Sequence, residues 1–166
     1  MSITSLSEAT RRLLEPRTAT TKRRLKTVSQ LANVGVPVNV MLAPIIPAIN
    51  SHEILPMAKA ASEAGASSIV HTIVRLNGAI GELFTDWIKS ALPDRAEKVL
   101  HQIESCHGGT LNDSRFGKRM RGEGTIAKQI NDLMTLAKHK YFANKKKASL
   151  NTSLHQQYKD GQLKLF

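Results

Sequence analysis

The fold is decided by residues 38–74, which read VNVMLAPIIPAINSHEILPMAKAASEAGASSIVHTIV. Residues 38–43 are β-branched and largely apolar, so they predict a buried strand that the following prolines end. Residues 68–74 predict a second buried strand, and between the two Ser51 is a suitable cap for a helix that Gly65 terminates. This order predicts a βαβ unit with parallel strands and a right-handed crossover, and hence an α/β fold.

Helical patterns flank this unit on both sides. Ser7 is suited to the start of a helix that Pro16 stops, and Gly35 to the left-handed end of a second helix. After residue 78 the apolar spacing predicts three more helices, with a glycine-bearing loop before the last of them. The expected helices cover residues 7–15, 20–33, 51–64, 79–92, 93–106 and 125–142, and the loop covers 112–124.

Two buried parallel strands do not make a stable sheet, because both read as interior strands without a polar edge. One interpretation is that Ile3 and its neighbours add a third short strand. The other is that the chain begins in the middle of a larger barrel. Both interpretations stay open at this point.

Composition sets further bounds on the protein. The chain has 166 residues, of which 41% are hydrophobic and 4% aromatic, so it can bury one aliphatic core. Its single cysteine, Cys106, excludes a disulfide framework, an all-cysteine zinc site and a self-sufficient iron–sulfur cluster. No apolar run is long enough to span a membrane, and the first residues lack a signal-peptide pattern, so we expect a cytoplasmic protein without a membrane partner.

The net charge of +11 lies at the two ends of the sequence. Residues 1–26 hold seven basic and two acidic side chains, residues 27–114 five and eight, and residues 115–166 twelve and three. Basic flanks around an acidic middle are typical of a folded unit that faces a polyanion such as nucleic acid, and also of a helix followed by a solvated tail. The run of lysines at 145–147 favours a disordered tail.

Candidate ligand-binding residues follow the predicted strands, because α/β folds bind ligands at the carboxyl ends of their strands. Residues 43–47 read APIIP and present apolar side chains that suit a flat heteroaromatic ring, or form only a rigid connection. Arg75 follows the second strand, where it pairs with a carboxylate or phosphate or lies in solvent. The glycine-bearing loop is either an anion or nucleic-acid site or a solvated loop, and its basic side chains are Arg115, Lys118, Arg119 and Arg121.

The histidines and the cysteine predict no catalytic group or metal ligand. The six histidines show no paired metal-ligand spacing. Cys106 and His107 are adjacent, and adjacent helical residues point in different directions, so the pair predicts a structural cysteine.

Several ordered motifs together resemble one family. They are LEPR at 14–17, GVPV at 35–38, APIIP at 43–47 and LNDSRFGKRMRG at 111–122. In this order they resemble the C-terminal half of radical S-adenosylmethionine (radical SAM) proteins of the spore-photoproduct-lyase-like, DNA-repair-photolyase-like group. The resemblance implies a partial (β/α)6 TIM-like barrel and a lyase or DNA-repair type of radical chemistry.

The resemblance also implies two cofactors, S-adenosylmethionine and a 4Fe–4S cluster held by a Cys-x3-Cys-x2-Cys loop. The cluster cleaves S-adenosylmethionine, and the radical so formed abstracts hydrogen from the substrate. Cys106 stands in no such motif, so neither cofactor is expected to bind tightly to this chain alone.

The adenosine end of that cofactor site is what the resemblance carries over. It implies that Ser2 lies near the ribose, that Ala43 and Ile45 lie near adenine, and that Arg75 and Leu76 lie at the mouth of the sixth barrel strand. Ala48 stands where the family has glycine and Ser51 where it has aspartate, two departures at the turn after the fifth strand.

These observations predict three regions. Residues 1–110 form a half-barrel with strands 4–6, residues 111–143 a loop and helix, and residues 144–166 a disordered basic tail. We expect a radical SAM fragment, from a truncated gene or an alternative start, that is inactive alone, or one chain of a split enzyme whose separate N-terminal half holds the cluster. The alternative is a basic nucleic-acid-binding module without catalysis.

Overall fold

The computed structural model describes residues 1–145, 149 and 151–159. Three strands form one parallel sheet in the order β1 (Ser2–Ile3), β2 (Asn39–Ile45) and β3 (Ser68–Ile73). Ser2 pairs with Met41, and Met41 pairs with Val70. The predicted α/β fold and parallel pairing are therefore confirmed, and the sheet contains the short third strand at Ile3.

The helices confirm the predicted order of elements. They are α1 (Glu8–Leu14), α2 (Thr21–Asn33), α3 (Ile54–Glu63), α4 (Ala79–Ala91), α5 (Pro93–Cys106), α6 (Gly124–Phe142) and α7 (Ser153–Lys159). Ser7 accepts a hydrogen bond from the Thr10 amide and caps α1 as predicted. Gly35 follows α2 at φ 80°, the left-handed conformation expected there.

The start of α3 differs from the prediction. Ser51 does not cap an α-helix, because Ser51–Glu53 form the short 3-10 helix η1 and α3 begins at Ile54. The preceding Asn50 points its side chain back to the strand ends instead. The local sequence pattern could not predict this use of Asn50, because one of its hydrogen-bond partners, Thr4, lies 46 positions away in the sequence.

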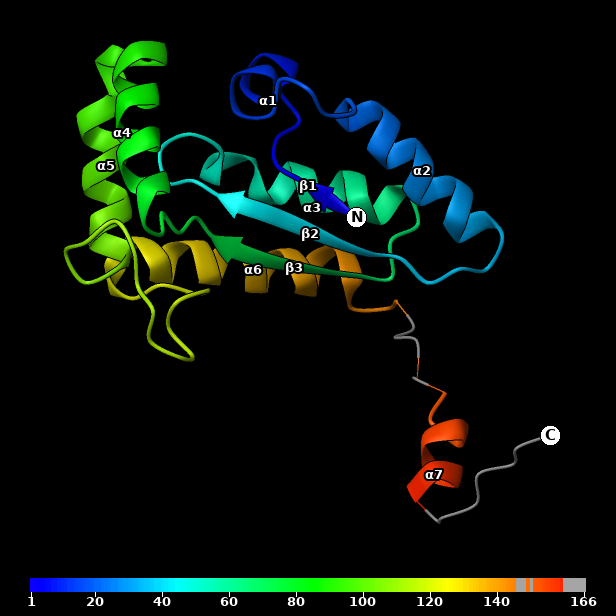
Figure 1. Ribbon diagram of the computed structural model, residues 1–166. Helices are drawn as coiled ribbons and strands as arrows, with labels where there is room; N and C mark the ends of the chain where they lie inside the picture. The colour runs from blue at the N-terminus through cyan, green and yellow to red at the C-terminus, as the bar shows by residue number, and fades with distance from the viewer. Residues whose placement is uncertain (146–148, 150, 160–166) are drawn as a thin grey trace.

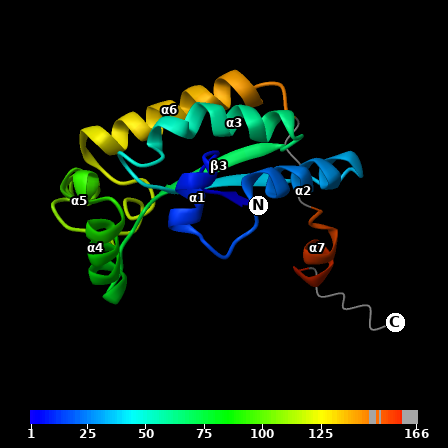
Figure 2. The same ribbon diagram turned by 90° about the horizontal axis from the view of Figure 1, so that it is seen from above.

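Among the described residues, helices cover one face of the sheet and leave the other open. In Figure 1 the sheet lies in front of α3 and α6, which pack on its rear face, and Figure 2 shows the same two helices along one side of the strands. The aliphatic core lies between these layers and includes Ile3, Leu42, Ile69, Met57 and Met134. Met41 and Val70 alternate with the core residues and remain 40% and 39% exposed on the opposite face.

Helices α4 and α5 lie beyond the carboxyl ends of the strands (Figure 1). They enclose a second apolar cluster with the segments that leave β2 and β3, and this cluster includes Ile46, Val74, Leu76, Ile88 and Val99. The two helices therefore close the strand ends on one side.

Part of the segment predicted as a disordered tail is helical. The seven-residue helix α7 has no buried side chain, and a Gln156 amide bonded to the Thr152 carbonyl at 2.9 Å forms its first turn. Residues 146–148, 150 and 160–166 of the predicted tail, including two of the three consecutive lysines, lie outside the described residues. No helix among the described residues has the length and apolar character needed to cross a membrane.

Candidate functional site

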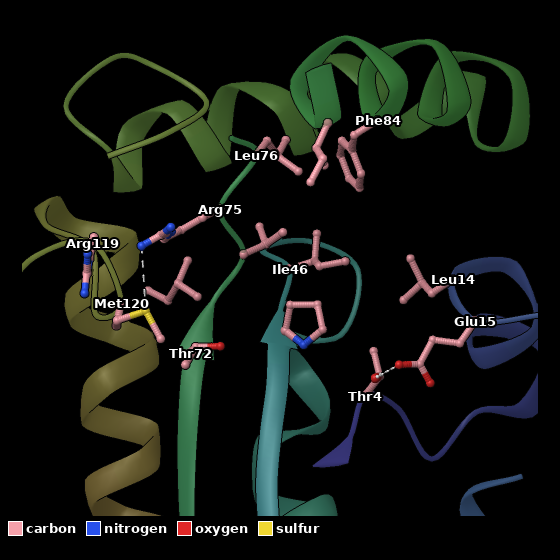
Figure 3. A pocket seen from close by; sticks show the side chains of 14 residues that line it. Thr4, Leu14, Glu15, Ile46, Thr72, Arg75, Leu76, Phe84, Arg119 and Met120 are labelled. Carbon is pink, nitrogen blue, oxygen red and sulfur yellow. Dashed lines mark hydrogen bonds between the residues drawn. The ribbon is translucent and has the colours of Figure 1, made fainter. Parts of the chain in front are cut away.

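A cavity of about 670 Å³ opens at the carboxyl ends of the three strands. Figure 3 shows side chains around it from the segment after β1, from the ends of β2 and β3, from the end of α1 and the start of α4, and from the loop before α6. We call it the strand-end cavity. Its lining residues are Thr4, Leu14, Glu15, Pro44, Ile46, Thr72, Ile73, Val74, Arg75, Leu76, Ile80, Phe84, Arg119 and Met120.

Asn50 fixes the backbone at the floor of the strand-end cavity. Its fully buried side chain accepts a hydrogen bond from the Ile46 amide at 2.7 Å. It donates to the carbonyl oxygens of Thr4 at 2.7 Å and Pro44 at 2.9 Å. The ends of β1 and β2 are thereby held together, although the sequence patterns gave Asn50 no role.

The five residues expected to bind the cofactor do not all lie at the strand-end cavity. Arg75 and Leu76 line the strand-end cavity, whereas Ser2, Ala43 and Ile45 do not. Ile45 is fully buried in the core between the sheet and its helices. Ser2 instead donates a hydrogen bond to the Ala43 carbonyl at 3.1 Å.

The neighbouring residues Pro44 and Ile46 line the cavity in place of Ala43 and Ile45. Side chains alternate along a strand, so a shift of one position moves a residue to the opposite face. The pairing of β2 with β3 is irregular between Leu42 and Ile45. A family motif gives positions along the chain, but this irregularity decides which of them face the cavity.

One side of the strand-end cavity carries a carboxylate. Glu15 accepts hydrogen bonds from the Thr4 hydroxyl at 2.8 Å and from the Arg24 guanidinium at 2.7 Å. Arg11 fixes the end of α1 by donating a hydrogen bond to the Glu15 carbonyl at 2.8 Å. The sequence singles out Glu15 only as part of the LEPR motif, and in the structure the first two residues of that motif, Leu14 and Glu15, line the cavity.

The opposite side carries two arginines. Arg75 follows β3 and Arg119 comes from the loop before α6, and Figure 3 shows both across the cavity from Thr4 and Glu15. Arg75 donates a long hydrogen bond to the Met120 sulfur at 3.9 Å. Arg119 lies 5.8 Å from the ring centroid of Phe116. Within the described part of the chain, neither guanidinium forms an ion pair.

The other two basic residues of the predicted anion site, Arg115 and Lys118, are paired inside their own loop. Arg115 contacts Asp113 at 2.7 Å and also Glu123, and Lys118 contacts Glu123 at 2.7 Å. Hydrogen bonds from Arg115 lower the pKa of Asp113 to about 2, and hydrogen bonds from Lys118 and Arg115 lower the pKa of Glu123. These ion pairs shape the loop and are not available to a ligand.

Arg121, the fourth of these residues, faces a different hollow. It lines that hollow with His71, Asn131 and Lys138, beside β3 and α6. The side chain of Asn131 lies 3.1 Å from His71 Nε2, and burial lowers the pKa of His71. The four basic residues predicted as one anion site therefore lie in three places: Arg119 at the strand-end cavity, Arg115 and Lys118 in ion pairs of their loop, and Arg121 at this second hollow.

The lone cysteine does not fit an iron–sulfur cluster. Cys106 is fully buried in the core, and burial raises the pKa of its thiol to about 11. A cluster needs several accessible thiolates, and the chain holds one cysteine in all. Among the described residues no group of three or more His, Cys, Asp or Glu side chains could hold a metal ion.

No family model, curated protein or solved structure matches the chain. The family resemblance therefore stays a prediction that rests on the motifs quoted above.

Proposed function

We propose that this chain forms the C-terminal half of a radical SAM-type barrel and binds the nucleoside part of S-adenosylmethionine in the strand-end cavity. The observation that carries the proposal is the position of this cavity, at the carboxyl ends of three parallel strands. Barrels of alternating strands and helices place their ligands at this end.

The open face of the sheet supports the half-barrel. Parallel sheets are normally covered on both faces, whereas here Met41 and Val70 stay exposed on the face opposite α3 and α6. In a closed barrel the corresponding face points to the interior and packs against further strands. The remaining strands of such a barrel would cover these two side chains.

The lining of the strand-end cavity supports a nucleoside ligand. Pro44, Ile46 and Leu76 offer apolar surface to a flat base, and Phe84 adds an aromatic ring at the α4 side. The Glu15 carboxylate faces the cavity beside the Thr4 hydroxyl and accepts hydrogen bonds of the kind that ribose hydroxyls donate. Apolar walls with a few placed polar groups are typical of small-molecule sites.

The chemistry of the proposed half is limited to binding and orientation. In the family that the chain resembles, a 4Fe–4S cluster and S-adenosylmethionine together supply hydrogen-atom abstraction. Cys106 does not fit such a cluster, so the proposal assigns no redox step to this chain. The thiolates would belong to the part of the barrel that contains the remaining strands.

Calorimetric titration with adenosine and with S-adenosylmethionine tests the proposal. Ile80, which lines the cavity and is 55% exposed, is replaced by tryptophan to fill the cavity without disturbing the core. The matched control is Leu136→Trp on α6, a residue 49% exposed and absent from the cavity. We expect the wild type and Leu136→Trp to bind both compounds, and Ile80→Trp to bind about tenfold more weakly or not at all. Absence of wild-type binding, or equal binding by Ile80→Trp, would contradict the proposal.

A second candidate function is binding of single-stranded nucleic acid, which Phe116 favours. Its ring is 93% exposed next to the Arg119 guanidinium, and exposed aromatic rings beside cations form stacking surfaces for bases. We expect Phe116→Ala to weaken binding of oligothymidylate, and Leu154→Ala, a change on exposed helix α7, to leave it unchanged. Affinity should also fall steeply between about 50 and about 200 mM salt. Binding that is absent, or independent of salt and of Phe116, would reject this function.

A further inference from the structure

Two arginines on one side of the strand-end cavity remain without an acidic partner among the described residues. Arg75 is half-buried where the chain leaves β3, and Arg119 is exposed on the loop before α6. Both line the cavity, and Figure 3 shows them on the same side. Two positive charges on one side of a cavity favour an anion beside them.

The backbone around both arginines is fixed. On either side of Arg75, the Val74 amide donates to the Ile45 carbonyl at 2.9 Å and the Leu76 amide to the Leu111 carbonyl at 3.2 Å. The loop is joined to the sheet beside Arg119, because the Ile73 amide donates to the Met120 carbonyl at 3.0 Å. The two side chains therefore extend from a preformed frame, which lowers the entropy lost on binding.

The charged side chains described around the cavity do not neutralise Arg75 and Arg119. Arg115 and Lys118 are neutralised by Asp113 and Glu123 within the loop. Across the cavity, the Glu15 carboxylate already pairs with Arg24 at 2.7 Å. The excess positive charge of the cavity lies on the side of Arg75 and Arg119, so an anionic group is drawn to that side.

We infer that Arg75 and Arg119 bind the phosphate group of a phosphorylated substrate that enters the strand-end cavity. A dianionic phosphate matches two guanidinium groups in charge and offers three terminal acceptor oxygens, whereas a single carboxylate offers one charge and two oxygens. The inference rests on the proposed function for the neighbouring nucleoside site. A mononucleotide carries this group as a dianionic monoester, whereas the diester phosphates inside a nucleic-acid strand carry one charge each, and the experiment below separates the two.

The test measures binding of thymidine 5′-monophosphate and of oligothymidylate by calorimetry. The variants are Arg75→Gln, Arg119→Gln and their combination, and the charge-matched control is the double variant Arg12→Gln/Arg95→Gln on exposed positions of α1 and α5. We expect each cavity variant to weaken binding about tenfold and the combination to abolish it, since a charge-assisted hydrogen bond contributes on that scale. The control should bind like the wild type. Circular dichroism confirms that each variant folds.

The outcomes distinguish this inference from the proposed function. Arginine-dependent binding of the mononucleotide assigns the site to a free nucleotide, and arginine-dependent binding of oligothymidylate alone assigns it to a strand. Equal binding by Arg75→Gln/Arg119→Gln and wild type overturns the inference, as does arginine-dependent binding of citrate without any phosphate compound. Adenosine, titrated in parallel, reports on the proposed function separately, because the arginine variants should keep their adenosine affinity.

Discussion

The side chain of Asn50 donates a hydrogen bond to the carbonyl oxygen of Thr4 at 2.7 Å, although the two residues lie 46 positions apart. The bond joins the end of β1 to the turn after β2 beneath the strand-end cavity. The position of Thr4, and through it of Glu15, therefore depends on Asn50.

Replacing Asn50 by alanine should strongly destabilise the protein. The change leaves three backbone groups, on Thr4, Pro44 and Ile46, without their partner. We expect the free energy of unfolding to fall by about 3 kcal/mol or more, since each unsatisfied buried polar group costs about 1–3 kcal/mol. Urea denaturation measures it, with Asn77→Ala at an exposed position as control. Equal unfolding midpoints for the two variants would contradict this role.

Replacing Ala48 by glycine should stabilise the protein. Ala48 has φ 60°, a left-handed conformation that costs a residue with a Cβ atom about 1–2 kcal/mol. Part of this gain is offset because glycine makes the unfolded chain more flexible. We expect a net gain of about 0.5–1 kcal/mol in thermal unfolding, and a loss of about 1 kcal/mol for Ala60→Gly inside helix α3. A destabilised Ala48→Gly variant would show that the conformation is not strained.

Acid should weaken the loop that carries Arg119. Hydrogen bonds from Arg115 lower the pKa of Asp113 from 3.8 to about 2. A lowered carboxyl pKa contributes stability that is present above the ordinary value and is lost as the pH falls through the folded value. As the pH falls from 3.8 to about 2, we expect the free energy of unfolding to decrease more for the wild type than for Asp113→Asn. The control Asp86→Asn, at an exposed position of α4, should follow the wild type. Parallel curves for wild type and Asp113→Asn would disprove the pairing.

The thiol of Cys106 should be inert in the folded protein. Burial raises its pKa to about 11, and the side chain is fully buried. Because the thiolate is the reactive form, we expect an aromatic disulfide reagent to modify Cys106 only after urea unfolds the chain. Rapid modification of the native protein would show an accessible thiolate.

Much of the architecture could be predicted because local sequence patterns determine where its strands and helices form. Residues 38–74 gave both long strands and their parallel pairing, and Gly35 marked the end of α2 correctly. These signals depend on side-chain period and on the conformational freedom of glycine, which act over a few residues. Strand β1, with two residues, is too short to produce such a period, so it stayed one of two interpretations.

The details of the site could not be predicted because they depend on contacts between distant segments. Pro44 and Ile46 replaced Ala43 and Ile45 at the cavity through an irregular register that no motif reports. Among the described residues Arg119 forms no ion pair, whereas Arg115 of the same loop forms two. Only the fold decides which arginine meets a carboxylate.

The central claim is that the strand-end cavity binds a nucleoside, and amide chemical-shift mapping by NMR tests it most directly. On titration with adenosine, we predict saturable shifts for Thr4, Ile46, Leu76 and Ile80, which line the cavity, and none for the exposed residues of α7. In Ile80→Trp the same titration should leave the shifts of Thr4 and Ile46 unchanged. Absence of saturable shifts in the wild type, or shifts confined to residues outside the cavity, would contradict the claim.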